Sequence, residues 1–151
     1  MSICLRYAQS KEEAQEVMND GFLKVFTKLD TFDRQKSFQM WLRRIMINTS
    51  IDYYRRRDKN TQPYDINNAK HTPDGSDVIG EITEKEILDM VQELPQSYRM
   101  VFNLYVIEGY KHEEIASMLG VHVGTSKSNL AKARKHLQNK IKKINNFTNT
   151  K

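Results

Sequence analysis

Apolar residues recur at intervals of three and four along residues 11–29, which is the spacing of one face of an α-helix. Ser10 precedes this stretch as a helix N-cap, and Glu12 and Glu13 follow in the first turn, where the helix dipole favours negative charge. The pattern predicts an amphipathic helix. Its expected buried face consists of Ala14, Val17, Met18, Gly21, Phe22, Val25, Phe26 and Leu29.

The same spacing returns after a connector at residues 30–36, and it predicts a second long helix from about Ser37 to Arg57. The expected buried stripe consists of Phe38, Trp41, Leu42, Ile45, Met46, Thr49 and Tyr53. Five arginines lie largely outside this stripe: Arg43, Arg44, Arg55, Arg56 and Arg57.

Residues 58–80 lose the helical period and are rich in turn-forming residues, which predicts a flexible linker. The period resumes at Ile82 and stops at Pro95, and a further helix ends near Gly109. No segment alternates as a strand does. We therefore expect an all-α fold of two small helical bundles joined by the linker. The expected parts are a first lobe at residues 1–57, a second lobe at 81–144 and a frayed tail at 145–151.

The segment from Lys111 to Leu137 has the pattern of a helix-turn-helix. Its first apolar face ends at Gly120, which suits the left-handed backbone of a tight turn, and a second helix opens near Thr125. The residues that we expect to pack inward are Ile115, Ala116 and Leu119 on the first helix, and Leu130, Ala133, Leu137 and Ile141 on the second. The outward residues, which such a helix presents to the major groove of DNA, are Lys127, Ser128, Ala131, Lys132 and Lys135.

The distribution of charge along the chain supports binding to a polyanion, because two basic segments flank an acidic one. The net charge is only +5, but residues 1–57 carry +4, residues 58–93 carry −6 and residues 94–151 carry +7. Residues 122–143 hold seven Lys and Arg side chains and no acid. An ordinary helical hairpin with a glycine turn is the alternative interpretation of this segment. The acid-free basic helix favours nucleic-acid binding instead.

Composition excludes several classes of protein. A length of 151 residues with 38% apolar residues suits two small cores. The single cysteine, Cys4, excludes an internal disulfide, and with the four His residues it shows no metal-ligand spacing. No apolar run approaches the about 18 residues of a membrane span, and the N-terminus has no cleavable apolar stretch. We expect a cytoplasmic protein with no metal, no cofactor and no membrane insertion.

The first lobe carries polar residues that a helix-turn-helix leaves unexplained. Asn48 and the cluster of Arg55, Arg56 and Arg57 suit single-stranded DNA, because an amide bonds a base edge and arginines hold a backbone. Trp41 would supply a stacking surface, but its place in the apolar stripe favours a core role. Asp52 would equally form an intrahelical ion pair with Arg55 or Arg56.

Three segments in order resemble an extracytoplasmic-function RNA polymerase sigma factor of the sigma-70 family: AQEVMNDGFLKVFTKLDTF, SFQMWLRRIMINTSIDYYRR and LPQSYRMVFNLYVIEGYKHEEIASMLGVHVGTSKSNLAKARKHL. The resemblance covers Cys4 to about Ile141. It implies a bacterial initiation factor that binds core RNA polymerase, recognises the minus-thirty-five and minus-ten elements of promoter DNA and opens the duplex. It also implies an anti-sigma partner and a cytoplasmic, nucleoid-associated location.

The resemblance assigns a role to each lobe. The residues implied for the minus-thirty-five element are Thr125, Lys127, Ser128, Ala131, Lys132 and Lys135. The residues implied for the minus-ten element are Phe38, Arg43, Arg44, Asn48, Arg55 and Arg56, and the connector with Phe38 and Asn48 resembles a pocket for a flipped base. The residues implied for docking on core polymerase are Glu16, Asn19, Asp20 and Leu23.

Three differences from the family pattern accompany this resemblance, and one is that Ala131 is small where a larger contact residue can occur. The family's first helix begins earlier, so we expect the first lobe to be short at its N-terminus. Ser126 occupies a recognition-helix position usually held by Val, and we expect its hydroxyl to bond back to the preceding turn.

Two further functions stay open on the sequence alone. A helix-turn-helix regulator would bind duplex DNA tightly without polymerase. A truncated sigma-like module would bind polymerase or an anti-sigma factor without initiating transcription. An enzyme is not expected, because the carboxylates are dispersed and Cys4 has no placed base.

Overall fold

The computed structural model describes residues 2–58 and 84–148, and within these ranges it contains helices and no strand. The all-α prediction is therefore confirmed for the described part of the chain. The predicted linker at residues 58–80 lies outside the described residues beyond Asp58, as do residues 149–151 of the predicted tail. Among the described helices, none is long and apolar enough to cross a membrane.

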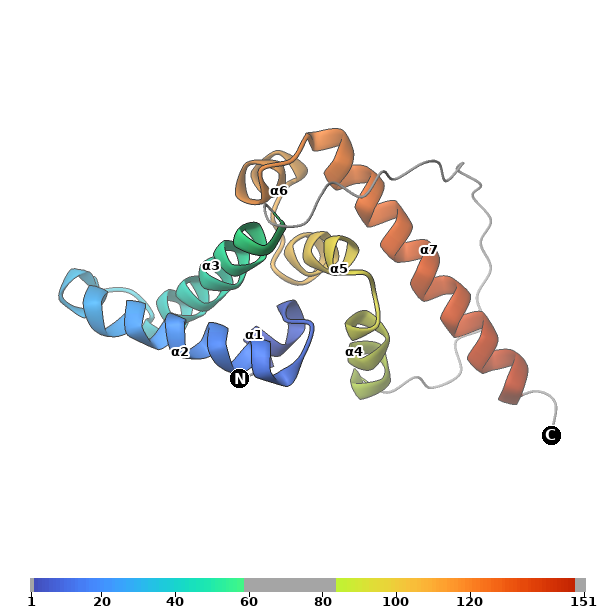
Figure 1. The fold of residues 1–151 in the computed structure, drawn as a ribbon, viewed down its shortest axis with the longest axis horizontal. Helices are drawn as coiled ribbons and strands as arrows, with labels where there is room; N and C mark the ends of the chain where they lie inside the picture. The colour runs from blue at the N-terminus through green and yellow to red at the C-terminus, as the bar shows by residue number, and fades with distance from the viewer. Residues whose placement is uncertain (1, 59–83, 149–151) are drawn as a thin grey trace.

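The first lobe contains three α-helices: α1 (Ser2–Tyr7), α2 (Lys11–Lys28) and α3 (Phe38–Asp58). A 3-10 turn at Leu29–Thr31 follows α2, and α2 and α3 form a hairpin that projects to the left in Figure 1. The predicted N-cap is confirmed, because the Ser10 hydroxyl accepts a hydrogen bond from the backbone N–H of Glu13 at 3.1 Å.

The second lobe contains four α-helices: α4 (Glu84–Gln92), α5 (Gln96–Phe102), α6 (His112–Leu119) and α7 (Val123–Thr148). A π-helical turn at Asn103–Ile107 continues α5, and the chain leaves it through Gly109 in a left-handed conformation with φ 78°. α5 and α6 both pack against α7, the long helix at the right of Figure 1. α7 continues to Thr148, beyond the lobe end that we expected at residue 144.

Each lobe has a small apolar cluster of its own. In the first lobe, α1, α2 and α3 bury Cys4, Ala8, Ala14, Val17, Val25 and Met46. The crossing of α2 and α3 is close at Gly21, because a side chain there would collide with the sulfur of Met46. In the second lobe, α4 and α7 bury Val91, Leu94 and Ala133.

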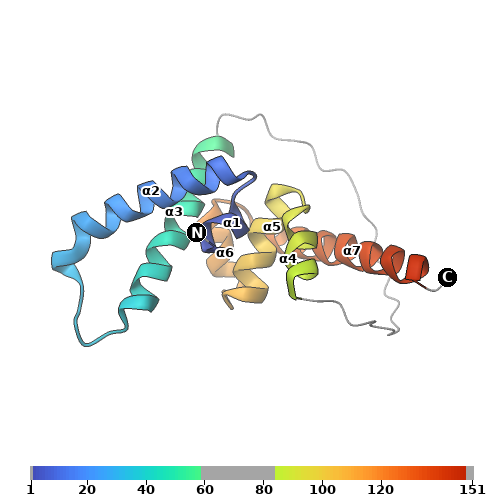
Figure 2. The same ribbon diagram turned by 90° about the horizontal axis from the view of Figure 1, so that it is seen from below.

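A further cluster, which we call the interlobe core, contains residues of both lobes. It consists of Tyr7, Ile47, Ile51 and Tyr54 from the first lobe and Met100, Val101, Leu104, Ile115, Leu119 and Leu130 from the second. Figures 1 and 2 show α1 beside α5, between α3 and α7. We expected two separate cores, and the structure adds one that the lobes share. The face of α3 that carries Ile47, Ile51 and Tyr54 was not predicted.

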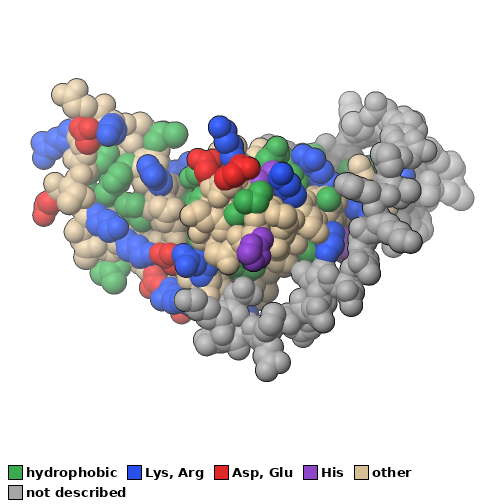
Figure 3. Space-filling model, turned by 90° about the horizontal axis from the view of Figure 1, so that it is seen from above, with side chains coloured by type: hydrophobic (Ala, Val, Ile, Leu, Met, Phe, Trp, Pro, Cys, Tyr) green, Lys and Arg blue, Asp and Glu red, His purple; other side chains and the backbone are tan. Residues whose placement is uncertain are grey.

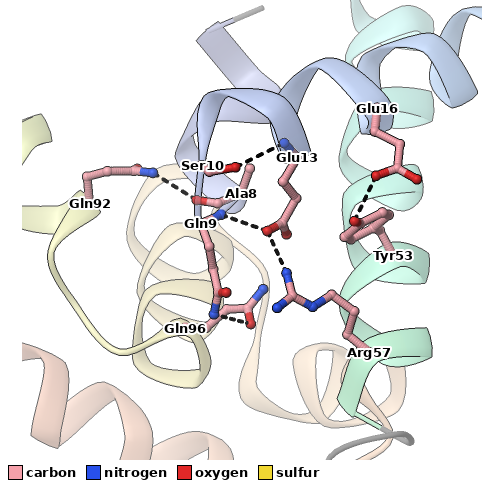
Figure 4. A network of polar contacts seen from close by, with 9 residues as sticks. All are labelled: Ala8, Gln9, Ser10, Glu13, Glu16, Tyr53, Arg57, Gln92 and Gln96. Atoms are coloured by element: carbon pink, nitrogen blue, oxygen red, sulfur yellow. Dashed lines mark hydrogen bonds and ion pairs between the residues drawn. The ribbon is translucent and has the colours of Figure 1, made fainter.

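Side chains of the second lobe also donate hydrogen bonds to backbone carbonyl groups at the C-terminal end of α1. A helix of six residues leaves its last carbonyl groups without intrahelical partners. Asn103 donates to the carbonyl oxygen of Arg6 at 2.8 Å, and Gln92 donates to the carbonyl oxygen of Ala8 at 2.8 Å. Figure 4 shows the Gln92 contact together with the bond between the Gln9 and Gln96 side chains at 2.7 Å. The two lobes are therefore joined by polar bonds as well as by apolar packing.

The expected buried face of α2 is too wide. Ala14, Val17, Gly21 and Val25 are buried, but Phe22, Phe26 and Leu29 are 42%, 74% and 47% exposed. The reason is that only α3 covers the outer part of α2, so a second apolar row has no partner there. The projecting end of the hairpin thus carries exposed apolar side chains.

The interlobe core predicts that the described lobes unfold together. Leu104 is fully buried in this core, so Leu104→Ala is expected to lower the free energy of unfolding by about 2–5 kcal/mol. The measurement is urea denaturation followed by fluorescence of Trp41, the single tryptophan, which lies in the first lobe.

The exposed Val106 gives the control for this prediction, since Val106→Ala removes methyl groups that are already 49% exposed. The shared core would be contradicted if Leu104→Ala left the urea midpoint of Trp41 fluorescence unchanged. In that case the helix content would show a separate unfolding transition of the second lobe.

Candidate nucleic-acid interfaces

The helix-turn-helix of the second lobe consists of α6, a turn and the first part of α7. Gly120 has φ 70°, so the left-handed turn that the sequence predicts is confirmed. Ile115, Ala116 and Leu119 are buried on α6, and Leu130 and Ala133 are buried on α7, as expected. α7 opens at Val123, two residues before the predicted start at Thr125.

The six side chains implied for the minus-thirty-five element all reach the surface of α7. Lys127, Ser128 and Lys135 are exposed, and Thr125, Ala131 and Lys132 are partly exposed. Two cations near this surface lie over aromatic rings, because Lys132 is 5.9 Å from the Tyr98 ring centroid and Arg134 is 6.0 Å from that of Tyr105. The contact of these residues with DNA remains a prediction.

Ser126 joins the two helices of this motif. It is fully buried, and its hydroxyl lies 2.9 Å from Nδ1 of His112 on α6. The His112 ring in turn stacks on Tyr105 with centroids 4.5 Å apart. The expected bond from Ser126 to the preceding turn is therefore wrong, since its hydroxyl bonds to the imidazole across the helix crossing. The bond adds a polar contact to the apolar packing of α6 on α7, directly before the exposed residues Lys127 and Ser128.

The connector and the start of α3 form an aromatic cluster in the first lobe. The Phe38 ring centroid lies 5.5 Å from that of Phe32 and 5.6 Å from that of Trp41, and Phe32 lies 5.0 Å from Trp41. Phe38 is 44% exposed, whereas Trp41 is partly buried and also packs against the first-lobe cluster. Trp41 thus packs beside the exposed Phe38 ring and on the first-lobe cluster, in agreement with its expected core role.

The six residues implied for the minus-ten element are spread along α3. Phe38 and Arg56 stand at opposite ends of the helix, about 27 Å apart at 1.5 Å per residue. Arg44, Asn48 and Arg55 share one face, because they are separated by four and seven residues. The structure therefore brings three of the six onto one face, and their binding to DNA remains a prediction.

Asn48 and Arg55 line a cavity of about 320 Å³ where the two lobes meet. Its remaining lining comes from α2, α3 and α6: Lys24, Lys28, Ile45, Ile51, Asp52 and Met118. Asp52 bonds to Lys24 of α2 at 2.8 Å, so the expected pairing of Asp52 with Arg55 or Arg56 is wrong. Lys24 approaches Asp52 from the neighbouring helix α2.

Arg43 does not point to solvent with the other arginines. Its guanidinium donates two hydrogen bonds to Glu108 of the second lobe, from Nε at 3.0 Å and from Nη2 at 2.8 Å. Glu108 is 6% exposed and also lies 3.6 Å from Arg6. Beside it, burial raises the pKa of the Tyr7 phenol well above its ordinary value, and the negative charge of Glu108 raises it further. No pattern in the sequence predicts this cross-lobe ion pair.

The four residues implied for polymerase docking form one row on α2. Leu23 is 64% exposed and Asn19 is exposed. The two acids are bonded to α3, because Glu16 accepts from the Tyr53 hydroxyl at 2.9 Å and Asp20 pairs with Arg56 at 3.3 Å. Figure 4 shows the first of these bonds, which raises the pKa of the Tyr53 phenol above its ordinary value. These carboxylates therefore hold the hairpin together while they face outward.

Sequence reasoning missed the apolar neighbours of this row, because it assigned them to the core. Phe22 and Phe26 of α2 and Leu29 of the turn that follows it, which we expected in the core, are exposed at the projecting end of the hairpin, as is Met40 of α3, for which we predicted no role. Hydrophobic side chains are visible there among charged ones in the space-filling view (Figure 3). A mixed apolar and charged surface of this kind suits a protein partner.

The described residues offer no arrangement that suits metal binding. Within residues 2–58 and 84–148, no three His, Cys, Asp or Glu side chains gather as a metal site would require. Cys4 is buried, and burial raises the pKa of its thiol, which leaves it unreactive.

Two family models match the chain, one on each lobe. The model of sigma-70 region 2 matches residues 1–60, and the model of sigma-70, region 4 matches residues 84–137. The region 4 match contains the whole of α4, α5 and α6 and the start of α7. The two models together account for most of the chain.

Relatives named as ECF RNA polymerase sigma-E factors are similar over nearly all of the chain. The one from Haemophilus influenzae is 27% identical, and the match covers 89% of this chain and 78% of the relative. The one from Escherichia coli K12 is 28% identical, with 95% and 81% covered.

A solved structure shares the fold. It is the sigma factor RpoE in complex with the anti-sigma factor NepR from Bartonella quintana, with a TM-score of 0.55 and 21% identity. The match covers 95% of this chain and 89% of that chain. The likeness extends over both lobes.

The bond between Ser126 and His112 predicts a measurable cost for its loss. Ser126→Ala leaves the imidazole without its partner at a buried helix crossing, so it is expected to lower the free energy of unfolding by about 1–2 kcal/mol. Ser128→Ala is the matched control, because Ser128 is exposed on the same helix and its loss should change stability by less than about 0.5 kcal/mol. Equal stability of both variants in urea denaturation would show that the bond contributes nothing.

Proposed function

This chain belongs to the extracytoplasmic-function sigma factors of the sigma-70 family, and we propose that it binds core RNA polymerase and directs promoter recognition and opening. The observation that carries the proposal is the presence, in one chain, of region 2 with an exposed hairpin and region 4 with a basic helix-turn-helix. A regulator that only binds duplex DNA needs the helix-turn-helix of region 4 but does not need region 2.

The second lobe supports a role at the minus-thirty-five element. In a helix-turn-helix the N-terminal part of the second helix enters the major groove, and later cations meet phosphates. Lys127, Ser128 and Lys135 are exposed on α7, and neither lysine forms an ion pair with a described residue. We propose that these three residues, with Thr125, Ala131 and Lys132, read this element.

The first lobe supports a role at the minus-ten element. The exposed Phe38 ring offers a stacking surface beside the connector, and Arg44, Asn48 and Arg55 share one face of α3. An aromatic surface with nearby cations holds single-stranded DNA by stacking and by backbone contacts, which stabilises opened promoter DNA. We propose that Arg43 and Arg56 join this surface when they are released from Glu108 and Asp20.

The row on α2 supports docking on core polymerase. Asn19 and Leu23 are exposed between the acids Glu16 and Asp20, and the apolar end of the hairpin adjoins them. Acidic and apolar groups in one row suit a basic, helical partner surface. We propose that Glu16, Asn19, Asp20 and Leu23 make this contact.

We further propose an anti-sigma factor as the regulatory partner. The support is the likeness of the whole fold to a sigma factor crystallised with the anti-sigma factor NepR. The protein then acts in the cytoplasm at the nucleoid, as a binding and positioning factor without catalysis of its own. The N-terminal lobe at residues 1–57, the linker at 58–80 and the lobe at 81–144 correspond in this proposal to polymerase docking, spacing and upstream recognition.

The decisive experiment is transcription by purified bacterial core polymerase with this chain on a genomic promoter library. New start sites that require the chain support the proposal. Co-elution with core polymerase without any new start site favours a module that only binds polymerase. Tight duplex binding without polymerase, and no co-elution, favours a helix-turn-helix regulator.

Two single variants are expected to separate promoter binding from binding to core polymerase. Lys127→Ala removes one charge-assisted phosphate contact, worth about 1.5–3 kcal/mol, so promoter affinity should fall by at least about tenfold while core binding is unchanged. The salt dependence of DNA binding should also become shallower by about one counterion. Asp20→Lys should instead weaken co-elution with core polymerase and leave binding to duplex DNA intact.

Each variant has a charge-matched control. Lys142→Ala removes a cation that is exposed on α7, about 22 Å along the helix from Lys127. Asp89→Lys reverses an exposed acid on α4, far from the α2 row in sequence and in the other lobe. If Lys127→Ala or Asp20→Lys weakened DNA binding and core polymerase binding equally, the surface assigned to that residue would be wrong.

A further inference from the structure

A row of ion pairs along the contact between α2 and α3 ends at a lysine that has no acidic partner. Two pairs join successive turns of the two helices: Asp20–Arg56 at 3.3 Å and Lys24–Asp52 at 2.8 Å. One turn further along each helix, the same register places Lys28 beside Asn48, which carries no charge. Lys28 therefore forms no ion pair with any residue in 2–58 or 84–148.

The cavity of about 320 Å³ lies beside this row, and its lining is positively charged. Lys24, Lys28 and Arg55 contribute three cations and Asp52 contributes one acid, which leaves a net charge of +2. Lys28, Asn48 and Arg55 are exposed, so a ligand can enter from solvent. The volume lies at the lower end of the range for small-molecule sites. The cavity therefore suits a small anion.

The end of the cavity next to the second lobe has a different chemistry. Arg55 lies seven residues beyond Asn48, about 10.5 Å along α3 at 1.5 Å per residue. A side-chain carbon at Gly120 would lie 4.0 Å from the Arg55 guanidinium, which places that group beside the turn after α6. Met118 of α6 lines the cavity as well. Guanidinium planes and thioethers both pack on flat aromatic rings, so this end suits an aromatic ring.

We propose that this cavity binds a nucleoside monophosphate, with the phosphate at Lys28 and Asn48 and the base at Arg55 and Met118. A phosphate monoester carries a charge of about −1.5 to −2 at pH 7, which matches the net charge of the lining. The Asn48 amide adds a hydrogen-bond donor beside the ammonium group of Lys28. A nucleoside without phosphate would leave Lys28 unpaired, and a sugar phosphate would leave Arg55 and Met118 without a ring to contact.

The binding itself goes beyond the proposed function, since Lys24, Lys28 and Met118 belong to none of the surfaces proposed for DNA or core polymerase. Asn48 and Arg55 do belong to the surface proposed for the minus-ten element. A bound nucleotide and single-stranded DNA would therefore exclude each other at these two residues. This consequence, unlike the binding itself, rests on the proposed function. The nucleotide would act as a small competitor of opened promoter DNA.

The test titrates the full chain with adenosine monophosphate as the probe, by calorimetry. Saturable binding with a Kd below about 1 mM is expected. Adenosine, ribose 5-phosphate and inorganic phosphate should each bind at least about tenfold more weakly, because each contacts only one end of the cavity.

Nuclear magnetic resonance of ¹³C-methyl-labelled methionines locates the bound nucleotide. The Met118 signal, assigned through Met118→Leu, should shift as the chain is saturated with adenosine monophosphate. The Met40 signal should not, because Met40 lies outside the cavity and is exposed.

Two variants should change the affinity in opposite directions. Lys28→Ala should weaken binding of adenosine monophosphate about fivefold or more and leave adenosine binding unchanged, because it removes only the phosphate contact. Asp52→Asn removes the acid of the lining and releases Lys24, so it should tighten binding of adenosine monophosphate severalfold. Lys11→Ala is the matched control, because Lys11 is exposed on the same helix, about 25 Å from Lys28 along its axis.

Competition is measured on the same parent chain with a fluorescent single-stranded oligothymidine. Saturating adenosine monophosphate should weaken its binding severalfold. Unchanged oligothymidine binding in the presence of bound nucleotide would refute the exclusion at Asn48 and Arg55.

The remaining outcomes decide the site itself. No saturable binding of adenosine monophosphate up to about 1 mM, or equal losses in Lys28→Ala and Lys11→Ala, would show that the cavity is not a nucleotide site. Equal affinities for adenosine monophosphate and ribose 5-phosphate, with the Met118 signal unmoved, would overturn the placement of the base. Failure of the proposed function is distinguishable, because it appears as no core binding and no transcription, whereas nucleotide binding is measured on the chain alone.

Discussion

α3 is buried on two different sides, and this constraint joins the two lobes, because α1 and α2 pack on it from the first lobe and α6 from the second. One side, through Met46 and Thr49, packs on α2 and closes the first lobe. The other side, through Ile47, Ile51 and Tyr54, packs into the second lobe. The polar residues of α3 are thereby confined to the remaining strips of its surface. Arg43 lies at the border of the second lobe and is bonded to it, whereas Arg44, Asn48 and Arg55 share the strip beside the cavity.

Local features of the sequence predicted the helices and their ends well. The Ser10 cap, the break at Pro95 and the left-handed Gly120 each act within a few residues, so their outcome does not depend on distant partners. The helix-turn-helix was predictable for the same reason. Its buried residues follow from spacing, and its turn requires a glycine-like backbone.

Features that depend on which surfaces meet were not predictable from spacing. Phe26 and Ile47 are both apolar at helical intervals, yet Phe26 is 74% exposed and Ile47 is buried, because a partner helix covers only the second. The row of Ile47, Ile51 and Tyr54 on α3 was not predicted, because the apolar stripe that we expected on this helix lay on its other side. The pairs His112–Ser126, Lys24–Asp52 and Arg43–Glu108 join residues 14, 28 and 65 positions apart, beyond any local rule.

The shared apolar contact also has a consequence for synthesis of the chain. Ile47, Ile51 and Tyr54 leave the ribosome before Leu104, Ile115 and Leu119, the residues that cover them. At about 5–20 residues per second, the delay between Tyr54 and Leu104 lasts roughly 3–10 seconds. During that interval the nascent first lobe presents an uncovered apolar row on α3, so newly made chains pass through a stage at which chaperones or neighbouring nascent chains have access to it.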